Sequence, residues 1–543
     1  MSKNHYDAII IGAGAGGGVA AGVLAEAGKR VLLLERGPHL ATETHYDHLR
    51  NQRLSQHGHN AGPDIQGNPR VLVDGAKPRI VAPHENGYHN NAAVVGGGTR
   101  VYGAQAWRFL PQDFHMASLY GVPEGSSLAD WPIQYDDLAP YYERAEWEIG
   151  VAGDGAVSSR HWPRQQGYPM PPLAENKRGQ ILREGAAKLG WETLPIPALI
   201  NTVEFNGRSA CTQCQHCVGF TCPVDAKNGT HNTLIARALA TGRCDLVTEA
   251  MVARIETSSG RVTGVTYFDQ DGQSQTVAAD VVICAGGAVE TARLLLNSAS
   301  PEHPHGLGNG YDQVGRHLQG HYYPGAVGLM PEPVYDGIGP GISTATVQFN
   351  HGNEGVIGGG MLANEFIELP IIFWYRQLPP DLPRWGAANK AFMRENYTRV
   401  MRVTGPVQET PHPEARVTLD PQVRDRWGIP VARLSGVAHG ETVKTAVFMF
   451  NRAREWLEAA GAVRVWGQPP GLYLSGGQHQ AGTCRMGDDP RTSVVDKWGR
   501  VHGHDNLFVM DGSVHVTNGG FNPVLTILAL AFRAAAHLVE GWK

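Results

Sequence analysis

Short runs of apolar residues recur along this chain, and several of them pass directly into glycine-rich segments. The first run covers residues 6–11 and continues into Gly12, Gly14 and Gly17, which are spaced as Gly-x-Gly-x-x-Gly. An alanine-rich stretch follows, and then a second apolar run at residues 31–34. This order predicts a strand, a tight turn, a helix and a second, parallel strand within about 30 residues.

The residue types in this segment suit the binding of a dinucleotide. Gly12 permits the tight turn, Gly14 lets the backbone approach a pyrophosphate, and Gly17 lets the helix pack closely on the strand. The free N–H groups at the helix N-terminus then face the phosphates. Glu35 follows the second apolar run, where a carboxylate can accept a hydrogen bond from a ribose 2′-OH. The segment therefore predicts a dinucleotide-binding βαβ unit.

Similar apolar runs later in the chain predict further parts of a nucleotide-binding fold. The segments with a strand-like pattern are residues 91–95, 244–247, 251–255, 261–268 and 280–284. The first of them leads into Gly96-Gly97-Gly98, and the last leads into Ala285-Gly286-Gly287. Helical patterns follow at residues 290–296 and again in the stretch that ends near residue 535.

The spacing of these segments predicts a discontinuous domain organisation. We expect an α/β protein in which residues 1–110, 201–304 and 471–543 form a Rossmann-like domain. Residues 111–200 and 305–470 are richer in Trp, Tyr, Phe, Pro and His, and we assign them to an α+β substrate-binding domain with a mixed sheet.

Charge and length exclude some kinds of partner. The 543 residues carry 46 basic and 51 acidic side chains without a long basic run, which argues against nucleic-acid binding or a polybasic membrane patch. The apolar run at residues 524–532 is too short to cross a bilayer. We see no signal-peptide pattern and expect a cytoplasmic protein, although folded export alongside a signal-bearing partner stays open.

The C-terminal motifs are the most specific in the chain. They are residues 479–487 (HQAGTCRMG), 494–496 (VVD), 500–503 (RVHG), 507–513 (LFVMDGS) and 522–523 (NP), followed by the last helical stretch. Together they resemble the glucose-methanol-choline oxidoreductases, which are FAD-dependent alcohol oxidases and dehydrogenases. The N-terminal glycine motif, the glycine loop at 96–98 and the segment 285–291 are also similar to this family, and they occur in its order.

This resemblance implies the reaction and the residues that catalyse it. Oxidising an alcohol removes the hydroxyl proton and passes a hydride from carbon to flavin N5, while the protein supplies orientation and a base. His479 matches the first catalytic position, where an imidazole with a pKa of about 6.5 can take the proton. Asn522 matches the second position, where members carry His or Asn, and its amide can hold the developing alkoxide.

Other residues are expected to contact the FAD. Asp511 resembles the flavin-contacting acid of the family, and Asn522 also lies at this end of the cofactor. The remaining expected contacts are Gly12, Gly14, Gly17, Glu35, Gly97, Gly98, Thr99, Val252 and Ala285. Some sugar-oxidising relatives carry a histidine in the glycine loop that bonds covalently to the flavin, whereas Val101 stands at the matching place here. Valine has no nucleophile, so we expect non-covalent FAD.

Three more histidines lie close to these motifs. With 24 histidines in the chain, a single one is more often structural than catalytic, and we interpret His502, His504 and His515 as structural. His515 is the most interesting of them, because it falls between Asp511 and Asn522 in a loop expected to pass near the flavin.

Four cysteines are crowded into one short segment. Cys211, Cys214, Cys217 and Cys222 form two C-x2-C steps and a Cys-Pro ending, which suits iron–sulfur ligation. Zinc could use the same residues with His216 as a spare ligand. A reduced structural loop without metal is a further reading that we favour slightly over a metal centre, and a disulfide is disfavoured in a cytoplasmic chain.

The leading functional hypothesis is oxidation of a secondary hydroxyl of a pyranose sugar or glycoside, with oxygen or another electron acceptor. The pairing of His479 with Asn522 and the aromatic, His- and Asn-rich central segment favour it. One alternative is an oxidoreductase for steroid, aryl or aliphatic alcohols. A second alternative is the iron–sulfur-containing catalytic subunit of a sugar dehydrogenase complex, with a small or haem-containing electron-transfer subunit as its partner.

Overall fold

The predicted βαβ unit forms part of the largest sheet of the protein. In the computed structural model, β1 (His5–Ile11) pairs in parallel with β2 (Val31–Leu34), and α1 (Ala15–Glu26) connects them. Residues 8–11 and all of β2 are buried, as expected for parallel strands covered on both faces. The structure describes residues 5–39, 66–74, 77–85, 87–89, 92–215, 217–364, 369–477 and 479–542.

Segments far apart in the sequence complete the central seven-stranded sheet. Its order is β6-β2-β1-β9-β8-β7, and β17 also pairs with β9. The parallel strands added to β1 and β2 are β6 (Cys244–Val247), β9 (Ser274–Cys284) and β17 (Leu507–Val509). The antiparallel strands are β7 (Met251–Ser258) and β8 (Arg261–Phe268).

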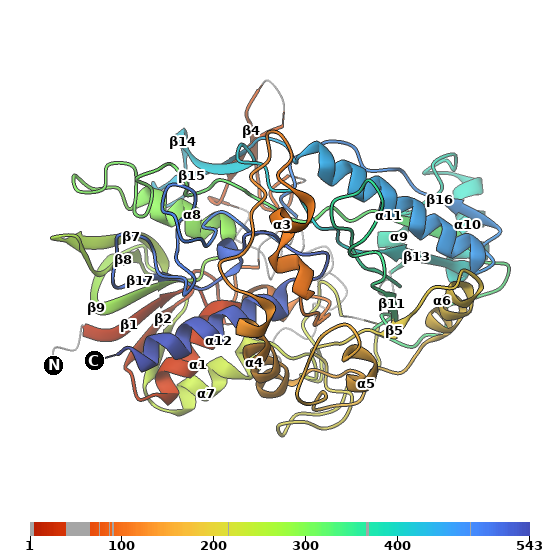
Figure 1. Ribbon diagram of the computed structural model, residues 1–543, viewed down its shortest axis with the longest axis horizontal. Helices are drawn as coiled ribbons and strands as arrows, with labels where there is room; N and C mark the ends of the chain where they lie inside the picture. Colours follow the sequence, from red (N-terminus) through yellow and green to blue (C-terminus); the bar gives the residue numbers. More distant parts are fainter. Residues whose placement is uncertain are drawn as a thin grey trace.

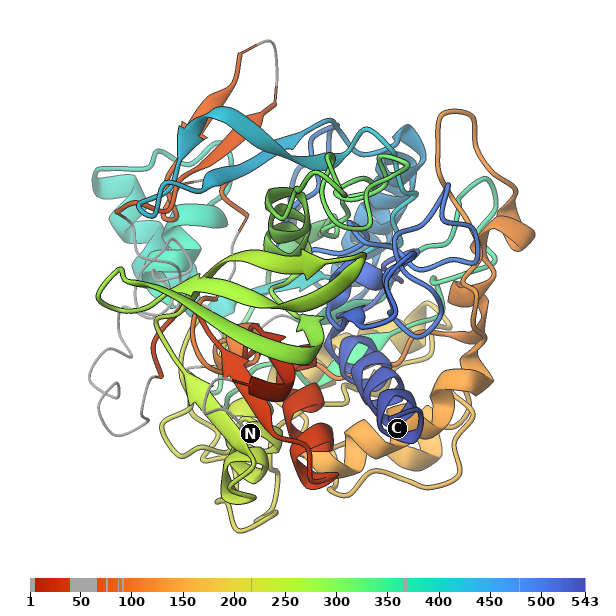
Figure 2. The ribbon, with the colours of Figure 1, turned by 90° about the vertical axis from the view of Figure 1, so that its left-hand side faces the viewer.

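Helices cover this sheet on both sides (Figures 1 and 2). On one face α1 packs against α7 (Leu234–Ala240) and α12 (Val524–Glu540), and α4 (Tyr135–Ala145) packs on α12. On the other side α8 (Ala288–Asn297) lies between β7 and a small four-stranded sheet. The C-terminal helix therefore packs beside the first helix of the chain.

The four-stranded sheet joins both parts of the predicted domain division. Its order is β14-β15-β3-β4, with β14 (Arg416–Arg424), β15 (Pro430–Ser435), β3 (Arg70–Val73) and β4 (Arg79–Val81). Strand β3 runs parallel to β15, which comes from the segment predicted to bind substrate. The predicted domain boundaries stay a prediction, and this sheet is the place where they are hardest to draw.

A six-stranded sheet forms the second large layer. It is antiparallel throughout, in the order β16-β10-β13-β12-β11-β5. Its strands are β5 (Leu194–Pro195), β10 (Gly325–Leu329), β11 (Thr344–Thr346), β12 (Leu362–Asn364), β13 (Val400–Thr404) and β16 (Arg464–Trp466). The long helix α11 (Gly440–Ala459) packs across it beside α6 (Lys177–Lys188), and Met449 and Trp456 are fully buried between them.

The remaining helices are short. They are α3 (Met116–Tyr120), α5 (Gly155–Ser158), α9 (Pro370–Arg376), α10 (Ala387–Asn396), a π turn at Glu146–Gly150, and single 3-10 turns at Gly97–Arg100, Pro111–Phe114, Thr230–Asn232, Tyr397–Arg399 and Gly512–Val514. None of the helices in the described part of the chain combines the length and apolar character needed to span a membrane.

The predicted fold class is confirmed, with one wrong strand. The runs at 6–11, 31–34, 244–247 and 280–284 all form strands of the central sheet. Residues 92–95 do not form the expected strand, and residue 91 lies outside the described residues. Their backbone bonds to loops instead, because the N–H of Val95 donates to the carbonyl oxygen of Pro38. An apolar run bounded by glycines is therefore a buried turn here.

Candidate active site

One cavity connects the two ends of the predicted site. It has a volume of about 680 Å³, and both the glycine turn after β1 and the C-terminal motif line it. Gly12, Gly14 and Glu35 lie at one end, while His479 and Asn522 also face the same space. Residues more than 450 positions apart in sequence thus share one pocket of the size that holds a cofactor and a small substrate.

Two glycines of the turn, Gly12 and Gly17, have no room for a side chain. Gly12 has a φ of +104°, and a Cβ atom there would lie 2.4 Å from the carbonyl oxygen of Ala285. A Cβ on Gly17 would lie 1.9 Å from the carbonyl oxygen of Gly12, so α1 packs directly on the turn. Gly14 and Ala15 line the cavity at the start of α1. The helix N-terminus therefore faces the cavity as a phosphate site requires.

Glu35 is held by the backbone on both of its oxygens. The N–H of Ala13 donates to Oε2 at 2.9 Å, and the N–H of Gly37 donates to Oε1 at 2.9 Å. Burial raises the pKa of this carboxyl group, and these backbone bonds oppose the rise. A carboxylate has about four acceptor positions, so two remain for a ribose hydroxyl at the cavity wall.

The second glycine loop lies against the first. The N–H of Gly96 donates to the carbonyl oxygen of Ala13 at 2.7 Å. Gly97, Gly98 and Thr99 all line the cavity, as does Val101 at the end of the same turn. The loop therefore closes over the glycine turn of the βαβ unit.

The other predicted cofactor contacts also reach this cavity. Val252, Ala285 and Asp511 are lining residues. Oδ2 of Asp511 accepts a hydrogen bond from the N–H of Gly287 at 2.9 Å and from the hydroxyl group of Thr291 at 2.6 Å. Asp511 therefore ties the motif at residues 507–513 to the glycine turn that follows β9.

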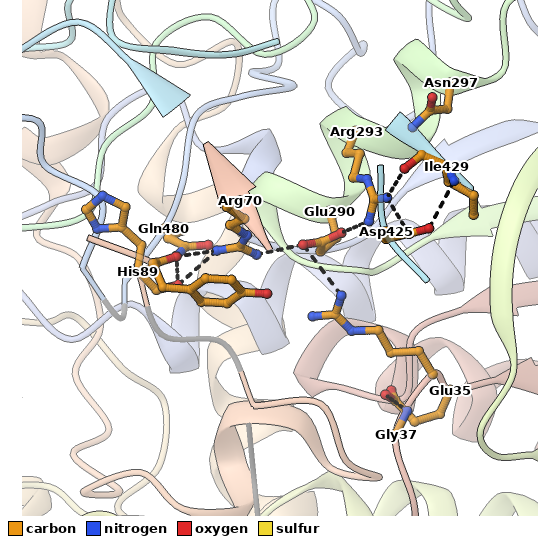
Figure 3. A network of polar contacts seen from close by, with 12 residues as sticks. Glu35, Gly37, Arg70, His89, Glu290, Arg293, Asn297, Asp425, Ile429 and Gln480 are labelled. Carbon is orange, nitrogen blue, oxygen red and sulfur yellow. Dashed lines mark hydrogen bonds and ion pairs between the residues drawn. The ribbon is translucent and has the colours of Figure 1, made fainter. Parts of the chain in front are cut away.

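A network of buried charges forms part of the wall near Glu35, and sequence analysis missed it. Figure 3 shows Arg70 and Arg293 reaching Glu290 from opposite sides. Nη2 of Arg70 lies 2.6 Å from Oε1 of Glu290, and Nη1 of Arg293 lies 3.3 Å from Oε2. Arg36 lies 3.5 Å from the same carboxylate, and Arg293 also pairs with Asp425 at 2.6 Å.

The arginines of this network control the ionisation of Glu290. Burial by itself would raise the pKa of Glu290, but the charges of Arg36, Arg70 and Arg293 lower it well below its usual range. Three guanidinium groups then face two carboxylates, Glu290 and Asp425. With Glu35, whose carboxyl group also interacts with Arg36, the arginines and acids at this wall are equal in number.

His479 and Asn522 lie at the other end of the cavity, joined by Tyr323. Nδ1 of His479 is 3.2 Å from the hydroxyl oxygen of Tyr323, and Nδ2 of Asn522 donates to that same oxygen at 3.0 Å. Oδ1 of Asn522 is buried without a hydrogen-bond partner among the described residues. Burial lowers the pKa of His479 well below its ordinary value, so its ring is neutral at pH 7.

A second histidine belongs to this group. His321 lines the cavity, and its Nδ1 lies 2.9 Å from Nδ1 of His479. His321 and Tyr323 come from the loop before β10, in the segment that was predicted to bind substrate only on its composition. No motif in that loop singled out these two residues.

The three neighbouring histidines do not reach the cavity in the described structure. The hydroxyl group of Ser493 lies 2.9 Å from Nε2 of His502, and the His504 ring packs against His303. His515 is fully buried against Phe109 and Trp131, away from the cavity lining. These positions favour the structural interpretation of all three.

The four clustered cysteines are thiols in this structure. Cys217 is buried, and Cys211, Cys214 and Cys222 are partly exposed. Burial raises the pKa of Cys211 and of Cys217. In the described part of the chain no three or more His, Cys, Asp or Glu side chains are grouped to hold a metal ion, and His216 lies outside the described residues. The iron–sulfur alternative stays a prediction.

Lys227 fixes the cysteine loop to the glycine loop. Its buried ammonium group donates to the carbonyl oxygens of Cys217 at 2.8 Å, Phe220 at 2.7 Å and Tyr102 at 3.1 Å. The N–H of Gly219 also donates to the carbonyl oxygen of Val101 at 2.7 Å. These bonds give the segment a structural role beside the cavity that needs no metal.

The mixed sheet, the glycine turn and the long cavity define a dinucleotide-dependent enzyme, and comparison with known families makes this specific. Residues 6–323 match the N-terminal family model and residues 411–531 the C-terminal family model, both described as GMC oxidoreductase. The chain belongs to the GMC oxidoreductase family. It is an FAD-dependent oxidoreductase that acts on CH–OH groups of alcohols or sugar-like substrates.

Curated relatives match over their whole length. The chain is 29% identical to the fructose dehydrogenase large subunit of Gluconobacter japonicus, covering 99% of this chain and 98% of that protein. It is 31% identical to 2-methyl-1,2-propanediol dehydrogenase of Mycolicibacterium austroafricanum, covering 99% and 96%. Among solved structures, pyridoxine 4-oxidase from Mesorbium loti has the same fold, with a TM-score of 0.67, 18% identity and coverage of 99% and 100%.

The observed cavity fits FAD. Gly12 and Gly17 leave no space for a Cβ, a helix N-terminus faces inward, and Glu35 retains acceptor positions for a ribose. Gly12, Gly14, Glu35, Gly97 and the other predicted contact residues that line the cavity would hold the cofactor.

Proposed function

We propose that this enzyme oxidises a secondary hydroxyl group of a pyranose sugar or glycoside, with His479 as the base and Asn522 as the hydrogen-bonding partner of the substrate oxygen. The observation that carries this proposal is the geometry of the cavity. It places a neutral imidazole and a carboxamide with open hydrogen-bonding positions in the same enclosure as the dinucleotide turn.

The side chains divide the chemistry between them. Among the described residues Nε2 of His479 has no hydrogen-bond partner, so it is available to take the hydroxyl proton. Nδ2 of Asn522 uses one hydrogen on Tyr323 and retains a second for the substrate oxygen. Donors aimed at a developing alkoxide stabilise the transition state more than the ground state. FAD, when bound, supplies the hydride acceptor.

Several groups near the catalytic end suit a sugar. Tyr323 and Tyr473 line the cavity, and the half-exposed ring of Tyr473 offers an aromatic surface that a sugar can contact. Arg376 and Arg402 also line the cavity and can donate to hydroxyl groups. The relative named fructose dehydrogenase large subunit supports a sugar substrate. The relative named 2-methyl-1,2-propanediol dehydrogenase supports the non-sugar alternative.

Anaerobic reduction of the bound flavin by a substrate panel tests this assignment. The panel contains pyranoses, glycosides, short aliphatic diols, aryl alcohols and steroids at matched concentrations. We expect a pyranose or glycoside to reduce the flavin fastest. Faster reduction by a diol, an aryl alcohol or a steroid would contradict the sugar assignment while leaving the alcohol chemistry intact. Reoxidation by oxygen or by an artificial acceptor then separates an oxidase from a dehydrogenase.

We further propose that the FAD is held without a covalent bond. Val101 lines the cavity in the glycine loop and offers no nucleophilic atom. Acid denaturation is therefore expected to release all of the yellow colour into the supernatant. Flavin that stays with the precipitated protein would contradict this proposal.

A partner subunit is a second proposal, supported by one relative. That relative is named as a large subunit, and this chain covers nearly all of it. If the enzyme passes electrons to such a subunit through its cysteine loop, the purified protein will contain iron and acid-labile sulfide. Their absence, with a visible spectrum of flavin alone, would restrict the protein to the simple flavoenzyme.

A further inference from the structure

His321 lies between a backbone loop and the imidazole of His479. Its Nε2 is 2.8 Å from the carbonyl oxygen of Asn518 and 2.9 Å from that of Gly519. On the other side of the ring, its Nδ1 is 2.9 Å from Nδ1 of His479. The two rings are almost perpendicular, at 89°. A single side chain therefore connects two carbonyl groups to the proposed base.

The hydrogen positions in this chain of contacts follow from which atoms can donate. A carbonyl oxygen only accepts, so Nε2 of His321 carries the hydrogen. A neutral imidazole has one N–H, which leaves a lone pair on Nδ1 of His321. The hydrogen between the two facing Nδ1 atoms then comes from His479. If His479 carried its hydrogen on Nε2 instead, the lone pairs of the two Nδ1 atoms would face each other at 2.9 Å.

Both rings are in the neutral form that this assignment requires. Full burial lowers the pKa of His321 to about 4, although the two carbonyl groups oppose the shift. Burial, together with the neighbouring His321, also lowers the pKa of His479 well below its ordinary value. A cationic His321, which would donate to His479 instead, is therefore disfavoured at neutral pH.

We propose that His321 is a positioning residue that keeps the hydrogen of His479 on Nδ1 and so presents the lone pair of Nε2 to the substrate. This inference rests on the proposed function, in which His479 is the base. In the reaction the hydroxyl proton moves to Nε2, and the electron pair of the O–H bond stays on the substrate oxygen. The Nδ1–H of His479 keeps donating to His321, and this hydrogen bond stabilises the imidazolium that forms.

The backbone around both histidines is built to hold this contact. His321 has a φ of +65°, a left-handed conformation that residues with a side chain rarely adopt. The buried carboxyl group of Glu409 accepts a hydrogen bond from the N–H of Gly320 at 3.2 Å, directly before His321. The side-chain amide of Asn518 donates to the carbonyl oxygen of His479 at 2.7 Å.

Tyr323 is the second acceptor for the same hydrogen. Its hydroxyl oxygen is 3.2 Å from Nδ1 of His479, compared with 2.9 Å for the His321 nitrogen. The tyrosine oxygen also accepts the amide of Asn522. The shorter contact and the fixed tautomer of His321 make the histidine the stronger determinant of the proton position on His479.

Two substitutions of similar size separate an acceptor from a mere space-filler. In His321→Gln the side-chain carbonyl can accept from His479 while the NH2 group donates to the loop carbonyls, whereas His321→Leu has no acceptor. With FAD bound, we expect His321→Leu to slow flavin reduction by roughly 10- to 100-fold with little change in substrate affinity. We expect His321→Gln to restore most of the rate and the parental pH profile.

His317→Leu is the matched control. His317 is also a buried histidine with a left-handed φ, +64°, but it bonds to Ser127 and does not line the cavity. Its variant should reduce flavin at the parental rate. A parental rate in His321→Leu, or a His321→Gln enzyme as slow as His321→Leu, would overturn the positioning role. If His479→Ala also keeps its rate, the base assignment has failed instead.

The parental enzyme gives a test that needs no His321 variant to fold. In protein labelled with ¹⁵N-histidine, the signals of His479 are identified by their absence from a His479→Asn variant. We expect the shift of Nδ1 to be that of a protonated nitrogen and the shift of Nε2 that of an unprotonated one. The reverse pattern would overturn the proposal.

Discussion

The two ends of the cavity are built on opposite electrostatic principles. At the dinucleotide end the wall is charged, and the carboxylates are already bonded: Glu290 to Arg70 and Arg293, and Glu35 to two backbone N–H groups. At the other end, the imidazoles of His479 and His321 and the amide of Asn522 are neutral. His479 has an open Nε2 among the described residues, and Oδ1 of Asn522 is buried without a partner.

This difference separates binding from chemistry. Side chains whose hydrogen bonds are made within the protein keep a fixed position and a fixed charge. They therefore change little during a reaction. A buried acceptor without a partner costs about 1–3 kcal/mol, and a ligand that donates to it removes that cost. We therefore expect substitutions at the charged end to change stability and FAD retention, and substitutions at the neutral end to change the rate.

The largest effect is expected at the base. His479→Ala should slow flavin reduction by about 10²- to 10⁴-fold and leave FAD content nearly unchanged, since the glycine turn is untouched. Stopped-flow mixing with excess alcohol under anaerobic conditions measures this rate. The exposed His305→Ala serves as the control and should behave like the parent. A near-parental rate for His479→Ala would move the base to another residue.

The next effect is expected at the charged end. Glu290→Gln leaves Arg36 and Arg70 without their carboxylate, and breaking a buried ion pair on one side costs about 3–5 kcal/mol. Denaturant unfolding should show this loss, together with weaker FAD retention, while flavin reduction in the loaded enzyme stays close to parental. The exposed Glu354→Gln is the matched control. A large loss of rate with unchanged stability would break the comparison between the two ends.

The ion pairs of Glu290 also predict how the free energy of unfolding depends on pH in acid. Because the folded protein lowers the pKa of Glu290, the stability from this group is present above its unfolded pKa of about 4.3. It is lost as the pH falls below that value. The free energy of unfolding of the parent should therefore decline more steeply in acid than that of Glu290→Gln.

A smaller effect is expected at Asn522. Asn522→Ala removes a hydrogen bond to the substrate oxygen and should weaken transition-state stabilisation by roughly 1–4 kcal/mol. Asn522→His should be tolerated better, because relatives use histidine at this position. Pro523 follows directly and precedes α12, so each variant must first be shown to retain FAD. An Asn522→Ala enzyme with bound FAD and the parental rate would remove this residue from the catalytic group.

The smallest effect is expected at Glu409, where it should appear as a change in the slope of the free energy of unfolding against pH. Burial raises the pKa of Glu409 to about 7, although Ser475 and backbone N–H groups oppose the shift. Its folded pKa lies above the unfolded one, so its contribution to stability is full below about pH 4.3 and declines as the pH rises toward 7. Glu409→Gln should flatten this part of the profile of unfolding free energy against pH. An unchanged slope would show that the carboxyl group is ionised throughout.

Local sequence patterns were enough to predict the dinucleotide end. A strand, a glycine turn and a helix are determined by residues that are close together in the chain. The spacing of Gly12 and Gly17 is therefore enough to predict the turn without knowledge of distant residues. Position within the C-terminal motif was enough to single out His479 and Asn522 as candidates, and both face the cavity. The run at 92–95 shows the limit of this reasoning, because apolar residues are buried equally well in a strand and in a turn.

The sequence by itself thus determined the family, the cofactor-binding unit and the two candidate catalytic residues. Only the tertiary structure decided what surrounds them. His321 reaches His479 across 158 positions, and Arg70 reaches Glu290 across 220. Such pairs have no periodicity or spacing in the chain, because they arise where separate sheets and loops pack together. The proton position on the base and the charge of the cavity wall both depend on these contacts, so neither could be predicted from the order of residues.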